Sequence, residues 1–273
     1  MPLHHVVVSA RDAEPRQLML VLHGILGQGL NWRGVARRLA KARPEWGFVL
    51  VDLRAHGDSR DVPPPDSLEA AAGDLVALIE TLELPVRGVL GHSFGGKVAV
   101  ELVRQRPDGL RSLVVVDSLP GDRPDRRGSE GTERVITMLE GLPARFDDRE
   151  GFVSHVTGLG FGTPLARWLA QSLDKIEDGV RFGLDVARIR TLLDGYFERD
   201  LWPVLDPPPE GVIADLVIGG RSTVWSAAER ERGIALQRAY PDQVRVTVLA
   251  EADHWVHVDD PEGLHRVVEE AMS

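Results

Sequence analysis

The stretch Gly91-His92-Ser93-Phe94-Gly95 has the residue types and spacing of a serine nucleophile on a tight turn. An apolar run, residues 86–90, precedes it, and apolar residues recur at helical spacing from 96 to 103. A serine at the apex of such a strand–turn–helix needs small neighbours, which the glycines two positions before and after it provide. The turn would also place the N–H of Phe94 at a helix N-terminus, where it can hold an oxyanion. The pattern therefore predicts that Ser93 is a nucleophile.

The same glycines also fit the first part of a phosphate-binding loop, G-x-x-x-x-G-K-[ST], through Gly91, Gly96 and Lys97. In that interpretation Asp117, which follows the apolar run 113–116, would hold a magnesium ion. The last position of the motif is Val98, which has no hydroxyl for the metal. At least two strand-like runs also precede the motif, whereas a phosphate-binding loop usually follows the first strand. We therefore favour the nucleophile, and expect Lys97 to be a solvated helix residue.

A serine hydroxyl needs a base that takes its proton, and the base needs an acid that orients it. The sequence has nine histidines, and His254 is the best placed of them. It follows the last apolar strand-like run, 244–249, by a few residues, so a loop can bring it over the sheet edge. His257 is the local alternative, which we expect to be structural.

The elements that must position these residues alternate between strand and helix. Strands are expected at 6–9, 17–22, 47–51, 86–90, 113–116, 214–218 and 244–249, and helices at 31–42, 67–82, 96–103, 227–239 and 261–272. This alternation predicts an α/β fold with a mostly parallel sheet covered on both faces. Between 130 and 202 the pattern is helical, without a convincing strand. We therefore expect a core of residues 1–118 and 211–273, and a helical cap, 119–210, over the carboxyl edge of the sheet.

The amino-acid composition limits which classes of partner and ligand we expect for this protein. A formal net charge of −10 argues against nucleic acid or an anionic membrane as the main partner. The absence of cysteine excludes disulfides and thiolate sites. The histidines form no metal motif, so we expect neither a metal nor a cofactor. The N-terminus lacks the features of a signal peptide and no run reaches membrane-spanning length, so a soluble cytoplasmic protein is expected. The sequence does not indicate an oligomeric state.

Four motifs together resemble the successive signatures of the α/β-hydrolase superfamily. They are His23-Gly24, the run 52–59 (DLRAHGDS), the serine motif 91–96 (GHSFGG) and Asp253-His254-Trp255. Within the superfamily the chain is most similar to the small abhydrolase-type esterases. That resemblance implies cleavage of short and medium acyl esters or thioesters. It also implies an oxyanion hole from the backbone N–H groups of Ile25 and Phe94.

The chain departs from the common superfamily pattern at the acid. Many members carry it in a G-x-x-D loop after the strand that follows the cap, and here that loop has Ser222 in place of the aspartate. The expected substitute is Asp117, because the end of a neighbouring strand lies within reach of the far nitrogen of His254. The esterase branch that the chain resembles also places its acid there. Asp253 is a poorer candidate, because a side chain usually points away from the ring of its neighbour.

The remaining candidates have structural or binding roles. His23 is expected to brace the oxyanion loop, and Asp52 and His56 to hold a loop together. Phe152 and Phe161 are expected in the core of the cap. Residues that could contact substrate are His23, Gly24, His92, Trp168, Trp202 and Trp255.

The sequence thus predicts a serine hydrolase with the triad Ser93, His254 and Asp117, acting on a small-molecule acyl substrate. A carbon–carbon bond hydrolase, a lactonase or a perhydrolase would use the same triad. A ligand-binding protein without activity on this scaffold is the alternative from another class.

Overall fold

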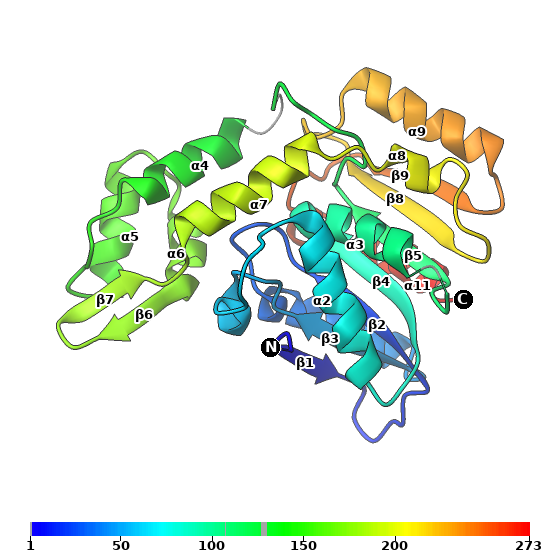
Figure 1. Ribbon diagram of the computed structural model, residues 1–273, viewed down its shortest axis with the longest axis horizontal. Coiled ribbons are helices and arrows are strands. Elements are labelled where there is room, and N and C mark those ends of the chain that lie inside the picture. Colours follow the sequence, from blue (N-terminus) through cyan, green and yellow to red (C-terminus); the bar gives the residue numbers. More distant parts are fainter. Residues whose placement is uncertain (1, 107, 127–129) are drawn as a thin grey trace.

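The computed structural model describes residues 2–106, 108–126 and 130–273 (Figure 1). Residue 1 of the predicted core and residues 127–129 of the predicted cap lie outside the described residues, as does residue 107. In the described part of the chain, no helix is long and apolar enough to cross a membrane.

The core is a sheet of seven strands in the order β1-β3-β2-β4-β5-β8-β9, in which all neighbours are parallel except β1 and β3. The strands are β1 (His5–Val8), β2 (Gln17–Leu22), β3 (Trp46–Val51), β4 (Val86–His92), β5 (Ser112–Val116), β8 (Ile213–Gly219) and β9 (Val244–Leu249). Each coincides with a predicted strand to within two residues at either end. The fold is the α/β-hydrolase fold that the sequence predicts.

Helices cover both faces of this sheet (Figure 1). They are α1 (Arg33–Ala42), α2 (Leu68–Thr81), α3 (Phe94–Gln105), α9 (Ala227–Ala239), α10 (Val256–Asp259) and α11 (Pro261–Ala271), with 3-10 turns at Gly29–Trp32 and Gly57–Ser59. Alternate residues of one strand enter different cores: Leu20 packs with α2 and α3, whereas Met19 packs with α1 and α11. The continuous apolar runs follow from this, because both faces of the central strands are buried.

The segment between β5 and β8 forms α4 (Glu130–Glu140), α5 (Arg149–Gly158), α6 (Thr163–Leu169), a 3-10 turn (Ala170–Ser172), β6 (Leu173–Ile176), β7 (Gly179–Phe182), α7 (Val186–Glu198) and α8 (Trp202–Leu205). The expectation that it contains no strand is wrong, because β6 and β7 pair as an antiparallel hairpin. Both strands are only four residues long and half-buried, so they lack a clear alternation. The Asp178-Gly179 pair at their turn is the signal that could have revealed them.

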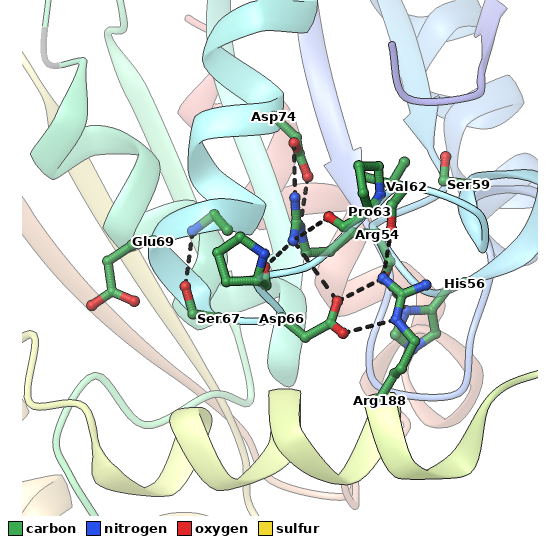
Figure 2. A network of polar contacts seen from close by, with 12 residues as sticks. Arg54, His56, Ser59, Val62, Pro63, Asp66, Ser67, Glu69, Asp74 and Arg188 are labelled. Carbon is green, nitrogen blue, oxygen red and sulfur yellow. Dashed lines mark hydrogen bonds and ion pairs between the residues drawn. The ribbon is translucent and has the colours of Figure 1, made fainter. Parts of the chain in front are cut away.

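Arg188 of α7 fastens this segment to the core (Figure 2). Its guanidinium forms two hydrogen bonds of 2.7 Å to Asp66 and donates at 2.6 Å to the carbonyls of Arg60 and Val62. From the opposite side, Arg54 reaches toward Asp66 at 3.8 Å and donates two hydrogen bonds to Asp74 of α2. The loop between β3 and α2 is therefore tied to α2 by its own Arg54 and to the inserted segment by Arg188.

Lys97 of α3 makes a second junction, and the prediction that it is solvated is wrong. Its side chain is fully buried, and burial lowers the pKa of Lys97 to about 7. Nζ donates to the carbonyls of Gly121 at 2.6 Å, Tyr196 at 2.5 Å and Arg199 at 2.9 Å. Three carbonyl acceptors require three N–H donors, which only the ammonium form of lysine has. Lys97 therefore joins α3 to both the beginning and the end of the inserted segment.

Candidate active site

Ser93 stands at the centre of the sheet, between the end of β4 and the start of α3. Its φ of 53° and ψ of −120° are a strained conformation for a residue other than glycine. The chain passes so close to itself here that a Cβ on Gly91 would lie 2.1 Å from the carbonyl oxygen of Gly95. A Cβ on Gly95 would lie 2.5 Å from the carbonyl oxygen of His23. Both glycines of the motif are thus required by close backbone approach.

His254 and Asp117 complete a continuous line of hydrogen bonds with Ser93. His254 Nε2 lies 3.1 Å from Ser93 Oγ, and His254 Nδ1 lies 2.7 Å from Asp117 Oδ2. The carboxylate can therefore accept a hydrogen bond from Nδ1–H, which leaves the lone pair of Nε2 directed at the serine hydroxyl. The neighbouring Asp253 does not reach the ring; it accepts the backbone N–H of His254 instead, at 2.7 Å. The structure brings together the three residues that the sequence predicts as a triad.

Asp117 is fully buried, and other groups besides His254 hold its carboxylate. Gly219 N–H donates to Oδ1 at 3.0 Å, and Ser222 Oγ donates to Oδ2 at 2.6 Å. Ser222 stands where many superfamily members carry the acid, so its position still serves the same histidine, now through Asp117. The contact from Ser222 to Asp117 is not predicted from the sequence. A hydroxyl in the expected acid position was the signal that could have indicated this contact.

The loop after β2 carries the predicted oxyanion donor, and two histidines shape it. His56 Nε2 accepts the N–H of Leu26 at 3.0 Å, and His23 Nε2 accepts the N–H of Leu53 at 3.0 Å. His56 thus occupies the N–H of Leu26 but not that of Ile25. Within the described residues, neither the N–H of Ile25 nor that of Phe94 donates a hydrogen bond. Both remain available to an oxyanion.

These bonds also determine the protonation of the two histidines. Because each Nε2 accepts a backbone N–H, each Nδ1 must carry the proton, which His23 donates to Gly24 at 2.8 Å and His56 to Arg54 at 2.9 Å. Burial lowers the pKa of His23, and lowers that of His56 to about 3. Both are neutral near pH 7. As the sequence predicts, His23 and His56 hold loops rather than touch a reacting group.

His92 forms a hydrogen bond to the loop that carries His254. Its Nε2 donates to the carbonyl oxygen of His254 at 2.8 Å, and its ring lies 4.8 Å from that of His254. Burial, and then the neighbouring His254, lower the pKa of His92 well below its usual value. His257 stacks on Trp32 with ring centroids 4.5 Å apart, in the structural role that the sequence predicts. Burial lowers the pKa of His257 to about 4.

A cavity of about 410 Å³ opens above Ser93. Of the residues predicted to contact substrate, those that line it are His23, Gly24, His92, Trp168 and Trp255. The structure does not bring Trp202 there: Trp202 is buried against Trp225, with ring centroids 5.9 Å apart. The sequence analysis missed the apolar wall opposite, formed by Val135 of α4 and Leu193 and Phe197 of α7. The apolar face of each amphipathic helix was the available signal.

The only described side chains grouped as a metal site would require are His4, Asp52 and Asp58, whose ligand atoms lie within 4.8 Å of one another. Asp52 and Asp58 lie on the loop after β3 and His4 directly precedes β1, and none of the three lines the Ser93 cavity. Asp52 already accepts the N–H groups of Gly29 at 2.7 Å and Asp58 at 3.0 Å, together with His4 Nδ1 at 3.0 Å. Asp52 therefore holds its loop together, as the sequence predicts.

Comparison with known proteins agrees with this geometry. Residues 19–267 match the alpha/beta hydrolase family. The chain is 29% identical to a Mus musculus protein named sn-1-specific diacylglycerol lipase ABHD11, over 96% of this chain and 82% of that protein. It is 27% identical to the Escherichia coli esterase YbfF, over 98% of each. A solved structure described as a marine microorganism esterase superposes with a TM-score of 0.80 at 23% identity, covering 98% of both chains. Since the family match spans almost the whole core, the chain belongs to the alpha/beta hydrolase family.

Proposed function

We propose that this chain hydrolyses carboxylic ester or thioester bonds of small to medium acyl substrates, with Ser93 as the nucleophile. The observation that carries the proposal is the line of hydrogen bonds from Ser93 Oγ through His254 to Asp117, at 3.1 and 2.7 Å. The two unused N–H groups beside it support the same reaction. The names of the mouse and Escherichia coli relatives, a lipase and an esterase, also support it.

In the proposed reaction, Ser93 Oγ attacks the acyl carbon while His254 Nε2 takes the hydroxyl proton. The N–H groups of Ile25 and Phe94 donate to the oxyanion of the tetrahedral intermediate. His254 then gives the proton to the leaving alcohol or thiol, and an acyl-serine remains. Water deprotonated by His254 attacks that acyl-serine and releases the acid. Asp117 stays ionised and stabilises the imidazolium in both halves.

The proposal includes a role for residues 119–210 as a cap that limits the substrate. Val135, Leu193 and Phe197 of this segment form an apolar wall of the Ser93 cavity, and Trp168 forms another. The apolar part of this cavity, which has a volume of about 410 Å³ and is also lined by polar residues such as Arg123 and Glu130, suits an acyl chain. The size of that apolar part would then set the preferred substrate.

The test is hydrolysis of p-nitrophenyl esters, from acetate to decanoate, by the wild-type protein and by Ser93→Ala side by side. We expect a rate that peaks at one chain length and disappears in the variant, while circular dichroism shows the same fold for both. Comparable turnover in the variant would refute Ser93 as the nucleophile. Absence of turnover on every ester and thioester in the wild type would refute the proposal and favour a carbon–carbon hydrolase or a binding protein.

A further inference from the structure

A second cavity, about 890 Å³ in volume, lies on the flank of the molecule, outside the one that holds Ser93. Its walls include Gly34 and Val35 of α1, Pro164 of α6, Val258 of α10 and Pro261 of α11. It therefore runs between the inserted segment and the side of the core that α1 and α11 cover. We refer to it as the lateral groove.

The lateral groove and the Ser93 cavity share one boundary. Five residues line both: Asn31, Leu165, Trp168, Trp255 and His257. Trp168 and Trp255 meet edge to face, with ring centroids 4.9 Å apart and an interplanar angle of 82°. Because the same side chains line both spaces, the groove adjoins the Ser93 cavity at Trp168 and Trp255, on a side that no residue of α4 or α7 lines.

The charged side chains along the groove have partners within the described residues, whereas His257 Nδ1 and His265 Nε2 are buried without a hydrogen-bond partner there. Arg38 forms an ion pair with Glu262, and Asp259 accepts the N–H of Asp253 at 3.0 Å. His265 faces Glu269 at 3.5 Å, one turn along the same helix. His257 is neutral near pH 7, because burial lowers its pKa to about 4. These groups leave no unpaired charge for an ionic ligand to meet.

Apolar surface remains exposed in the same place. Val258 is 64% exposed and Trp255 is 37% exposed, and both line the groove. Exposed apolar side chains that line a cavity together are a feature of ligand-binding grooves. The two spaces, about 410 and about 890 Å³, together exceed what one compact acyl group needs.

We propose that the lateral groove binds a long alkyl chain of the substrate, which passes Trp168 and Trp255 while the ester carbon lies at Ser93. This inference rests on the proposed ester hydrolysis and extends its substrate class to long-chain esters. The other arm of the ester lies on the α4 and α7 side of the Ser93 cavity. The chain in the groove belongs to either the acyl or the alcohol half, and kinetics with two ester series distinguish these.

Gly34 allows the groove to be filled without disturbing the fold. A Cβ placed there meets no atom within 4 Å, and Gly34 lines the groove but not the Ser93 cavity. The variant Gly34→Phe places a ring in the groove, and Gly34→Ala is its matched control, because both remove the same glycine from α1. Phenylalanine also avoids adding a tryptophan, so the native tryptophan fluorescence remains interpretable.

The kinetic test compares p-nitrophenyl acetate with p-nitrophenyl dodecanoate, and ethyl acetate with dodecyl acetate. We expect Gly34→Phe to lower kcat/KM for the long ester of one series by about tenfold or more, since each displaced methylene group changes binding about fourfold. Both short esters should react as with Gly34→Ala. Equal kcat/KM of the two variants on both long esters would overturn the inference. A loss on the short esters as well would place the effect at Ser93 and also overturn it.

A binding test separates this inference from the proposed function. Decan-1-ol is titrated into Ser93→Ala protein that also carries Gly34→Ala or Gly34→Phe, and tryptophan fluorescence reports binding near Trp168 and Trp255. We expect saturable binding that the phenylalanine weakens about tenfold. Such binding without turnover of any ester by the wild type would support the groove and refute hydrolysis. Ester turnover with binding that is absent or equal in both proteins would refute the groove alone.

Discussion

Three donors converge on the carboxylate of Asp117: the imidazole of His254, the N–H of Gly219 and the hydroxyl of Ser222. The strand end that carries Asp117 has a φ of 42°, a strained conformation for an aspartate. The bonds to Gly219 and Ser222 hold it there. In the proposed reaction, this carboxylate orients the ring of His254 through its bond to Nδ1.

We expect Asp117→Asn to lower kcat on the best p-nitrophenyl ester by about 10⁴-fold, because an amide can donate to Nδ1 and stabilise the wrong tautomer of His254. Asp253→Asn is the matched control. That carboxylate is next to the histidine in sequence but bonds only to its backbone N–H, so its loss should change kcat by no more than about threefold. Comparable losses of kcat in the two variants would refute Asp117 as the acid of the triad.

Ser222→Ala tests the hydroxyl that donates a hydrogen bond to the same carboxylate. Removing a hydroxyl that donates at 2.6 Å leaves one oxygen of Asp117 with less support, and we expect about a tenfold fall in kcat/KM. Ser222→Thr keeps the hydroxyl and should retain most of the activity. Steady-state kinetics of the three proteins decide this, and an inactive threonine variant beside a fully active alanine variant would contradict it.

At the scale of elements, the side chains of Arg188 and Lys97 join the inserted segment to the core. Arg188 of α7 ties that segment to the loop between β3 and α2, and the same loop carries His56, which holds the N–H of Leu26 (Figure 2). The loop between β3 and α2 therefore contacts both α7 and the predicted oxyanion loop. Lys97 joins α3 to the two ends of the segment.

We expect Arg188→Ala to lower the free energy of unfolding by about 2–3 kcal/mol, because it leaves the buried Asp66 without its bidentate partner. Arg190→Ala on the same helix is the control: Arg190 pairs with Glu133 and Glu140 inside the segment, in more exposed positions, and should cost less than about 1 kcal/mol. Urea unfolding monitored by fluorescence measures both. Similar values would show that Arg188 is no more than a surface ion pair.

At the scale of the whole molecule, four histidines around the site stay neutral in the folded protein, and this makes stability depend on pH. They are His23, His56, His92 and His257, each with a pKa lowered mainly by burial. In the unfolded chain, each takes up a proton near pH 6.5. Below that pH the unfolded state binds more protons than the folded state, so acid lowers the free energy of unfolding.

The contribution of His56 to this pH dependence can be measured separately, because the pKa of His56 is about 3 in the folded protein. The contribution of neutral His56 to the free energy of unfolding is complete above pH 6.5. It is lost as the pH falls toward 3, at up to about 1.4 kcal/mol per pH unit. We expect His56→Gln to be less stable at pH 7 but to lose less stability than the wild type between pH 6 and 4.5. Urea unfolding at four pH values in this range measures both slopes, and parallel slopes would show that His56 is protonated in the fold.

The sequence by itself determined the sheet and predicted Ser93 as the nucleophile and His254 as the base. Each of these depends on local pattern: continuous apolar runs for buried strands, glycines around Ser93 for the tight turn, and a histidine after the last strand. Asp117 was predicted from strand order as well, because parallel strand ends meet at one edge. Local sequence patterns were sufficient for a prediction wherever residues close in sequence are also close in space.

Only the tertiary structure decided the rest. Lys97 looked like a solvated helix residue, yet it is buried because Gly121, Tyr196 and Arg199 bring their carbonyls to it from the distant ends of the inserted segment. The bond from Ser222 to Asp117 and the lateral groove likewise arise from segments far apart in the chain, whereas the β6–β7 hairpin is local and was missed because its strands are short and half-buried. No pattern along a single segment records such contacts, because burial and pairing depend on what the other segments place opposite it.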